Sequence, residues 1–307
     1  MQNLYPNIQT TSSAAEIMND PEINAVAIAT PVFTHYELAK QALENNKHVL
    51  IEKPMAASVE ECTELIKLAE KHDLRLMVGH TFEYTAAVRK AKEIIDSGEL
   101  GDIFYIRSIR ANLGLFQKDI NVIWDLAPHD ISIMLYLLDK YPLTINAQGK
   151  AHFKQGIEDV ATTTLNFAKG TIGFIHTSWL DPDKIRKITV VGRKKMLVYD
   201  DIKTNEKIKI YDKGVEVPPY YDSYAEFHFS YRYGDIYTPR IQEYEPLRKE
   251  CEHFLECIRE GKTPHTDGYN GLRVVSILEA ASCSLKARGS QQTVHEDGFY
   301  LLNRKSA

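Results

Sequence analysis

Short apolar runs alternate with helical stretches in the first quarter of the chain. The apolar runs cover residues 25–30, 48–53 and 75–80. The two segments between them, 34–46 and 59–72, carry apolar residues at helical spacing. Buried parallel strands joined by crossover helices have this pattern. Ser58, followed three residues later by Glu61, forms a capping box, which predicts where the second helix starts.

The texture of the sequence changes near Gly98, which ends a further amphipathic helix over residues 84–97. Most segments between residues 104 and 237 are β-like, and turns such as Lys169-Gly170 separate them, which predicts antiparallel hairpins in one sheet. One helix is expected to interrupt this part, over 126–138, and two more are expected to close the chain, over 244–260 and 268–287.

The fold class predicted from these patterns is α/β followed by α+β. A partial Rossmann-type parallel sheet precedes a domain with a large, open, mainly antiparallel sheet and flanking helices. We place the remainder of a dinucleotide-binding domain at residues 1–81. The substrate-binding and oligomerisation domain then covers residues 82–307 and includes the C-terminal helices.

The composition is that of a globular protein, because 44% of the 307 residues are hydrophobic and 26% are charged. The 37 basic and 42 acidic residues are mixed along the chain, so we expect no nucleic-acid partner. No apolar run approaches the roughly 18 residues that span a bilayer, and no signal peptide is recognisable. A cytoplasmic protein with a small-molecule partner and no membrane contact is the expectation.

Cysteine and histidine spacing gives no indication of a metal site. The four cysteines form no C-x-x-C pair, and we interpret them as core thiols. The eleven histidines include no H-E-x-x-H or comparable spacing. We therefore expect no bound metal.

Two motifs follow the first two predicted strands. An A-T-P-x-x-x-H turn spans residues 29–35, and Glu52-Lys53-Pro54 follows the second strand. Both lie at carboxyl ends of parallel strands, where open α/β sheets bind their ligands. A lysine there can donate a hydrogen bond to a reacting hydroxyl and stabilise the developing alkoxide. The alternatives are a solvated Lys53 and a surface His35 near a helix start.

A second candidate site is the sequence Trp124-Asp125-Leu126-Ala127-Pro128-His129. Pro128 suits a first helical turn, which places Asp125 and His129 one turn apart at a helix N-terminus. That position disfavours imidazolium, so His129 stays neutral and can accept a hydroxyl proton. In the alternative, Asp125 is only an N-cap and His129 is an exposed first-turn residue. We interpret Asp130 as a partner of the helix dipole.

These motifs and the strand spacing resemble the Gfo/Idh/MocA family, named after glucose-fructose oxidoreductase and inositol dehydrogenase. The resemblance implies a nicotinamide-dependent oxidoreductase with Lys53, Asp125 and His129 as its catalytic residues. It also implies that NAD or NADP lies against the two strand-end motifs, and that the Lys53-Pro54 peptide is cis. The cofactor-binding residues would be Thr30, Pro31, His35, Glu52 and Lys53.

Residues 177–186, T-S-W-L-D-P-D-K-I-R, resemble the branch of the family that oxidises nucleotide-linked amino sugars, such as UDP-N-acetylglucosamine at its 3-hydroxyl. Trp179 would then stack on a sugar face and Arg186 would pair with phosphate. Alternatively, Trp179 is a core residue and Arg186 pairs with Asp181 or Asp183. His80 and Asn112 complete the expected substrate-binding residues.

The chain contains no G-x-G-x-x-G, although the resemblance implies a strand, this turn, a helix and a second strand ahead of residue 1. We expect a start codon assigned too far downstream, because losing a central strand would expose an apolar edge. The alternative is a chain that genuinely lacks the unit.

The leading hypothesis for function is oxidation of a secondary hydroxyl of a sugar or sugar nucleotide, with hydride transfer to a nicotinamide. Oxidation of inositol or a free sugar is the second hypothesis, and a truncated, non-catalytic binding or scaffold protein is the third. An open sheet with one apolar face further predicts a homo-oligomer, a dimer or tetramer, packed sheet to sheet.

Overall fold

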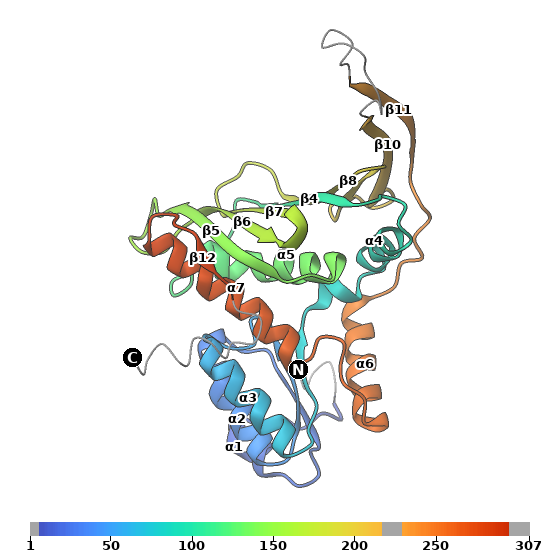
Figure 1. Cartoon of the computed structure of the whole chain (residues 1–307). Helices are drawn as coiled ribbons and strands as arrows, with labels where there is room; N and C mark the ends of the chain where they lie inside the picture. The colour runs from blue at the N-terminus through green and yellow to red at the C-terminus, as the bar shows by residue number, and fades with distance from the viewer. Residues whose placement is uncertain (1–5, 217–228, 295–307) are drawn as a thin grey trace. The chain divides into compact units, whose positions relative to one another are not determined.

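The computed structural model describes residues 6–216 and 229–294 and divides into two compact units (Figure 1). The first unit contains the chain up to His80 and also Glu250–Val275. The second contains Thr81–Lys249 and continues from Ser276. The division at residue 81 expected from the sequence placed both C-terminal helices in the second domain. By compactness, helix α6 (Pro246–Glu260) lies mostly in the first unit and helix α7 (Gly268–Lys286) belongs to both.

The first unit is built on three parallel strands in the order β1-β2-β3, as the alternating pattern predicted. Its elements are α1 (Ala14–Asn19), β1 (Ala25–Ile28), η1 (Val32–Thr34), α2 (His35–Glu44), β2 (His48–Glu52), α3 (Val59–Lys71) and β3 (Leu76–Gly79). Ile28 pairs with Ile51, and Glu52 pairs with Gly79. The three carboxyl ends therefore share one edge of the sheet.

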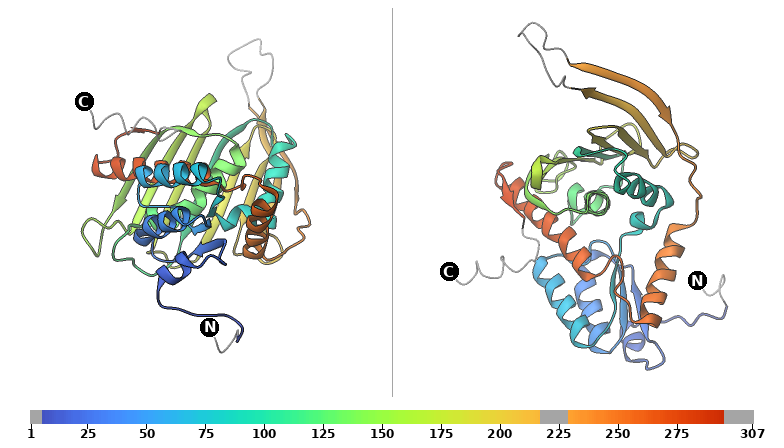
Figure 2. Two further views of the ribbon diagram at one scale, coloured as in Figure 1. Left: turned by 90° about the horizontal axis from the view of Figure 1, so that it is seen from below. Right: turned by 45° about the vertical axis from the view of Figure 1, so that its right-hand side comes forward.

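Helices α2 and α3 pack side by side along this sheet (Figure 2). The Ser58 hydroxyl accepts a hydrogen bond from the Glu61 amide at 3.1 Å, and the Ala57 amide donates to the Glu61 carboxylate at 2.9 Å. This confirms the predicted start of α3. Fully buried side chains such as Val49, Ile51 and Val78 form the core beneath the helices, so the apolar runs become the interior of the unit.

The second unit contains a nine-stranded sheet in the order β11-β10-β9-β8-β4-β7-β6-β5-β12. The strands are β4 (Ile103–Ala111), β5 (Pro142–Lys150), β6 (Val160–Phe167), β7 (Ile172–Ser178), β8 (Ile185–Gly192), β9 (Met196–Asp200), β10 (Ile208–Glu216), β11 (Ser230–Tyr237) and β12 (Gln292–Thr293). Only β4 and β7 run parallel; the other neighbours are antiparallel, as expected. Lys169 (φ 62°) and Gly170 (φ 80°) form the tight turn between β6 and β7.

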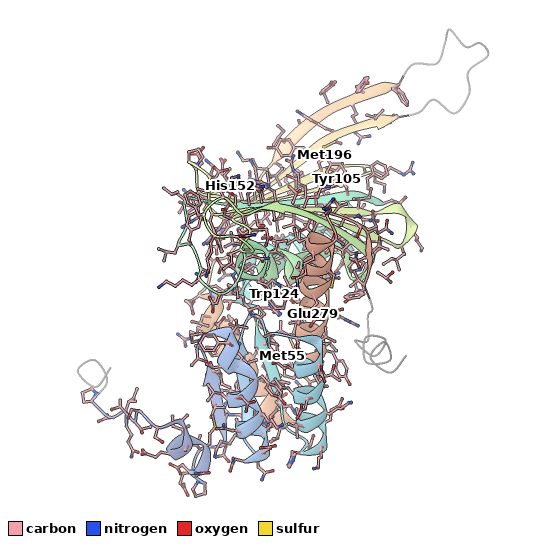
Figure 3. The ribbon with its side chains drawn as sticks, turned by 90° about the vertical axis from the view of Figure 1, so that its left-hand side faces the viewer. Met55, Tyr105, Trp124, His152, Met196 and Glu279 are labelled. Carbon is pink, nitrogen blue, oxygen red and sulfur yellow. The ribbon has the colours of Figure 1, made fainter. Side chains whose placement is uncertain are left out.

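Helices cover one face of this sheet. Helix α5 (Val122–Leu138) packs against β4, β6 and β7, and α4 (Ala86–Asp96) packs against α5 and β9. Tyr105 and Met196 lie on the opposite face from Trp124 of α5 (Figure 3). Within the described part of the unit, that opposite face carries no helix.

None of the described helices is long and apolar enough to span a membrane. Cys62 and Cys257 are buried, as expected for core thiols, but Cys251 and Cys283 are exposed, so that interpretation was wrong for half of them.

Candidate functional site

His35 connects the two strand-end motifs of the first unit. Its Nδ1 lies 2.9 Å from the carbonyl oxygen of Pro54, and its Nε2 lies 2.8 Å from that of Thr30. The side chain is 1% exposed, so the alternative of a surface histidine was wrong. Thr30 and Pro31 are themselves exposed at the end of β1. His35 therefore holds the backbone behind the residues that were expected to meet a cofactor.

Glu52 and Lys53 lie at the end of β2, both half-buried. The Lys53-Pro54 peptide is cis, as predicted. The Glu52 carboxylate accepts a hydrogen bond from the Lys53 amide at 3.2 Å. Gly79 makes room for it, because a Cβ atom at that position would lie 3.3 Å from the Glu52 side chain. The glycine at the end of β3 thus leaves space for the Glu52 side chain, where the Glu52-Lys53-Pro54 segment leaves the sheet.

His80 follows β3 at the same edge and is fully buried. Neither ring nitrogen has a hydrogen-bond partner among the described residues. Burial, together with the smaller effects of the nearby Lys53 and His265 charges, lowers the pKa of His80 to about 3. A buried imidazole with two unused nitrogens is uncommon in proteins, because buried polar groups normally find partners in protein or water. It is a place where a ligand can supply the missing hydrogen bonds.

Helix α5 begins at Val122, four residues earlier than the sequence indicated. The side chain of Asn121 caps it by accepting a hydrogen bond from the Trp124 amide at 3.2 Å. Pro128 consequently lies inside the helix, and His129 lies about two turns from its start. The argument that the helix dipole keeps His129 neutral was therefore wrong, since that effect fades within the first turn.

Asp125 accepts a hydrogen bond at 2.9 Å from the indole Nε1 of Trp179. Trp179 is 1% exposed and packs against Phe116, with ring centroids 5.5 Å apart. This position favours the core role for Trp179 over stacking on a sugar. Asp125 is not the helix N-cap, because Asn121 has that role, and it remains one turn before His129 on α5.

The remaining substrate-binding candidates lie at the ends of neighbouring strands. Arg186, near the start of β8, pairs with Asp201 at 3.4 Å rather than with Asp181 or Asp183. Asn112 follows β4, and its backbone N–H donates to the carbonyl oxygen of Ser178 at 3.2 Å. The Asn112 side chain lies beside Gly114 and is half-buried.

The candidates thus fall into two sets, one in each unit. Lys53 and His80 lie at the carboxyl ends of β2 and β3, the edge of the first unit's sheet where the sequence predicted ligand binding and which we call the ligand edge. Asp125 and His129 lie on α5 and Trp179 follows β7, all in the second unit. The meeting of Lys53, Asp125 and His129 in one cleft stays a prediction.

Sequence reasoning missed a buried polar cluster beneath α5. Arg110 donates to Asp130 through Nε at 2.8 Å and through Nη2 at 3.1 Å, and Ser108 donates to the same carboxylate at 2.7 Å. Asp130 is therefore an ion-pair partner and not a first-turn dipole partner. The available signal was the alternation along β4, where Ile106, Ser108 and Arg110 share its buried face.

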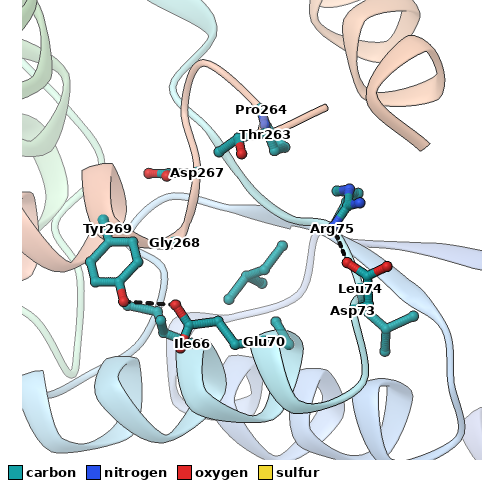
Figure 4. A pocket seen from close by; sticks show the side chains of 12 residues that line it. Ile66, Glu70, Asp73, Leu74, Arg75, Thr263, Pro264, Asp267, Gly268 and Tyr269 are labelled. Atoms are coloured by element: carbon teal, nitrogen blue, oxygen red, sulfur yellow. Dashed lines mark hydrogen bonds and ion pairs between the residues drawn. The ribbon is translucent and has the colours of Figure 1, made fainter. Parts of the chain in front are cut away.

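A cavity of about 300 Å³ lies elsewhere in the first unit (Figure 4). Tyr269 donates to Glu70 at its rim at 2.7 Å, and Arg75 pairs with Asp73 at 3.0 Å. Arg75 and Leu76 mark the amino end of β3. The cavity is therefore at the opposite edge of the sheet from Lys53 and His80, and it is not the predicted site.

Comparison with known proteins assigns both parts of the chain. Residues 4–80 match the GFO/IDH/MocA description "Oxidoreductase family, NAD-binding Rossmann fold", and residues 88–198 match the "GFO/IDH/MocA C-terminal domain". The first domain therefore belongs to a family of NAD-binding domains, which agrees with the predicted nicotinamide cofactor.

Individual relatives cover most of the chain at low identity. UDP-N-acetylglucosamine 3-dehydrogenase of Acidithiobacillus ferrooxidans is 27% identical over 87% of this chain and 80% of its own length. The NAD-dependent scyllo-inositol 2-dehydrogenase of Bacillus subtilis is 27% identical over 81% of this chain and 71% of its own.

Solved structures show the same fold. That of the Acidithiobacillus ferrooxidans enzyme matches with a TM-score of 0.73 at 24% identity, covering 91% of this chain and 84% of the other. A levoglucosan dehydrogenase complex with NADH and levoglucosan matches with a TM-score of 0.76 at 23% identity, covering 92% and 84%. With both domains matched in sequence and in fold, the chain belongs to the Gfo/Idh/MocA family of oxidoreductases.

Proposed function

We propose that the protein oxidises a secondary hydroxyl of a sugar or sugar nucleotide, with a UDP-N-acetylglucosamine-like substrate, at its 3-position, as the first candidate. One observation carries the proposal. At the ligand edge of an NAD-binding domain, a lysine lies beside a fully buried histidine whose two ring nitrogens have no hydrogen-bond partner among the described residues. Such a pair suits an oxygen-rich ligand, because Lys53 donates hydrogen bonds and a neutral imidazole both donates and accepts them.

The residues at this edge fit a dinucleotide. Thr30 and Pro31 are exposed after β1, and Glu52 and Lys53 are half-buried after β2. His35 fixes the two loops to each other through backbone carbonyls. We assign Thr30, Pro31, Glu52 and Lys53 to the cofactor, and we assign to His35 the role of holding their two loops in place. When bound, the nicotinamide supplies the acceptor for the hydride that leaves the substrate.

The chain's own groups would move the proton. His129 accepts the proton of the reacting hydroxyl, and the Lys53 ammonium donates a hydrogen bond to the same oxygen as negative charge develops on it. Both need to come within about 3 Å of that oxygen. Asp125, held by Trp179, provides a fixed negative charge one helical turn from His129.

The substrate class rests on the relatives. One is named for UDP-N-acetylglucosamine and one for scyllo-inositol, at the same 27% identity. The amino-sugar nucleotide comes first because residues 177–186 and the Trp124–His129 motif resemble that branch; inositol or a free sugar is the alternative. His80, Asn112 and Arg186 are the groups that we assign to the substrate.

Reduction of NAD or NADP by the purified full chain tests the proposal, with UDP-N-acetylglucosamine, scyllo-inositol, myo-inositol and glucose as separate substrates. We expect turnover with at least one, and a fall in kcat of about 10²- to 10⁴-fold for Lys53→Ala and for His129→Ala. Lys90→Ala and His72→Ala change surface residues of the same types and serve as controls. Dinucleotide or sugar binding without any turnover would favour a binding or scaffold protein instead.

We also propose that the open face of the nine-stranded sheet packs against a second copy. Tyr105 and Phe174 are 36% and 40% exposed there, with ring centroids 6.2 Å apart. Light scattering should give a dimer or tetramer for the wild type and a smaller species for Tyr105→Glu, which would place a charge in the interface. A monomeric wild type contradicts this assembly.

A further inference from the structure

Phe82 lies between Arg110 and His129 in the second unit. The Arg110 guanidinium carbon is 4.7 Å from the centre of the Phe82 ring. The His129 and Phe82 rings meet edge to face, with centroids 5.0 Å apart and an interplanar angle of 67°. One aromatic side chain of η2 (Thr81–Tyr84) therefore contacts both a strand residue and the proposed proton acceptor.

Arg110 and Asp130 are fixed by burial and by hydrogen bonds to each other. Arg110 is 5% exposed and Asp130 is 1% exposed, and two hydrogen bonds join them in the fork geometry of an arginine-carboxylate pair. Ser108 donates a further hydrogen bond to Asp130. Because Asp130 directly follows His129, the pair fixes this turn of α5 to β4.

We infer that Phe82, supported by the Arg110-Asp130 pair, is a positioning residue for His129. The inference rests on the proposed function, in which His129 accepts the substrate proton. The ion pair fixes the backbone that carries His129, and the Phe82 ring restricts the side-chain rotations of the imidazole. Arg110 in turn holds Phe82 through the attraction between a cation and the face of an aromatic ring.

This arrangement has a kinetic consequence. Proton transfer depends steeply on the placement of the acceptor, so an imidazole free to rotate spends less time in the productive orientation. Phe82 has no part in binding the cofactor under this proposal. Loss of its ring should therefore lower kcat and leave the KM values for cofactor and substrate nearly unchanged.

The central variant is Phe82→Leu, which removes the ring and keeps an apolar side chain. We expect a fall in kcat of about tenfold, with KM changed less than about twofold. Phe82→Tyr keeps the ring and should restore most of the rate. Phe153→Leu is the matched control, because Phe153 makes a similar edge contact with Phe116, with ring centroids 5.1 Å apart.

A double-mutant cycle with His129→Gln separates positioning from general damage to the fold. In the His129→Gln background, the Phe82→Leu change should have no further effect on the residual rate, because the residue it positions is gone. Equal effects of Phe82→Leu in both backgrounds would overturn the inference.

A spectroscopic measurement gives an answer that does not depend on turnover. The ring resonance of His129, assigned by its disappearance in His129→Gln, should move in Phe82→Leu and stay in place in Phe153→Leu. An unmoved resonance in Phe82→Leu overturns the inference. If instead His129→Gln keeps full turnover while the resonance moves as expected, it is the proposed role of His129 that fails, and the contact with Phe82 stands as a structural one.

Discussion

Trp179 donates its indole N–H to the Asp125 carboxylate across 2.9 Å. Trp179 is almost completely buried, and Asp125 lies on α5, the helix that also carries His129. A tryptophan in this position contributes a large apolar surface to the core and one directed hydrogen bond to the proposed site. We therefore interpret it as the residue that orients Asp125.

Trp179→Phe should lower kcat about tenfold, because the ring volume is largely kept while the hydrogen bond that orients Asp125 is lost. The chain's second tryptophan supplies the control. Trp124 donates its indole N–H to Ser282 at 2.8 Å, so Trp124→Phe removes a similar bond that does not involve Asp125. Steady-state kinetics of both variants checks the prediction, and equal losses of kcat would contradict it.

The buried His80 should make the protein sensitive to acid. Its pKa is about 3 in the folded chain, against 6.5 ordinarily. Between these two values the unfolded chain binds the proton and the folded chain does not, so stability falls as the pH falls through this range. The slope for one proton is about 1.4 kcal/mol per pH unit.

Urea unfolding between about pH 7 and pH 4 measures this dependence. His80→Asn removes the titrating group, so its free energy of unfolding should vary less with pH than that of the wild type. His48, whose pKa is lowered mainly by burial, contributes in the same direction in both proteins. Parallel curves for the two proteins would show that His80 does not titrate in this way.

Much of the fold follows from local signals in the sequence. The alternation of strands and helices up to residue 80, the Ser58 cap and the Lys169-Gly170 turn each depend on neighbouring residues, and each appears in the structure where it was expected. The start of α5 does not follow from such signals. Pro128 suggested that the helix begins near it, but α5 starts earlier, because the buried side chains of Val122 and Ile123 pack in the core. This packing outweighs the preference of proline for a first turn.

The candidate site was predictable only where its residues follow a strand or share a helix. Lys53 and His80 follow neighbouring strands, and Asp125 and His129 are one turn apart. The partners of these residues come from distant parts of the chain: Trp179 is 54 residues from Asp125, and Arg110 is 20 residues from Asp130. Such contacts depend on which strands become neighbours, and the residue pattern of one segment does not contain that information.

The Arg110-Asp130 pair allows a test of its contribution to stability. Arg110→Met should destabilise the protein by about 3–5 kcal/mol, because it leaves the buried Asp130 carboxylate without its cation. Asp130→Leu should destabilise the protein to a similar extent, because it leaves the buried Arg110 guanidinium without its carboxylate. The double variant should be closer to the wild type than the sum of the two losses, since it leaves neither charge unpaired. Urea unfolding of the four proteins gives the coupling energy, and strictly additive losses would contradict the argument.

His35 allows the ligand edge to be tested separately from the chemistry. Its ring lies between the carbonyl oxygens of Pro54 and Thr30, which belong to the loops after β2 and β1. Replacing it with alanine removes both contacts and leaves a space behind the loops. We expect the affinity for the nicotinamide dinucleotide to fall about tenfold, because the loops would have to be ordered again when it binds.

His48→Ala is the matched control for this experiment. His48 also bonds to the backbone, since its Nδ1 accepts from the Arg75 amide at 2.8 Å, but it lies at the amino end of β2, the edge away from Lys53. Both variants should lose about 1 kcal/mol or more of stability, because each loses buried contacts and a histidine hydrogen bond. Only His35→Ala should bind dinucleotide more weakly in calorimetric titration. Unchanged affinity in His35→Ala, or an equal loss in both variants, would separate this edge of the sheet from cofactor binding.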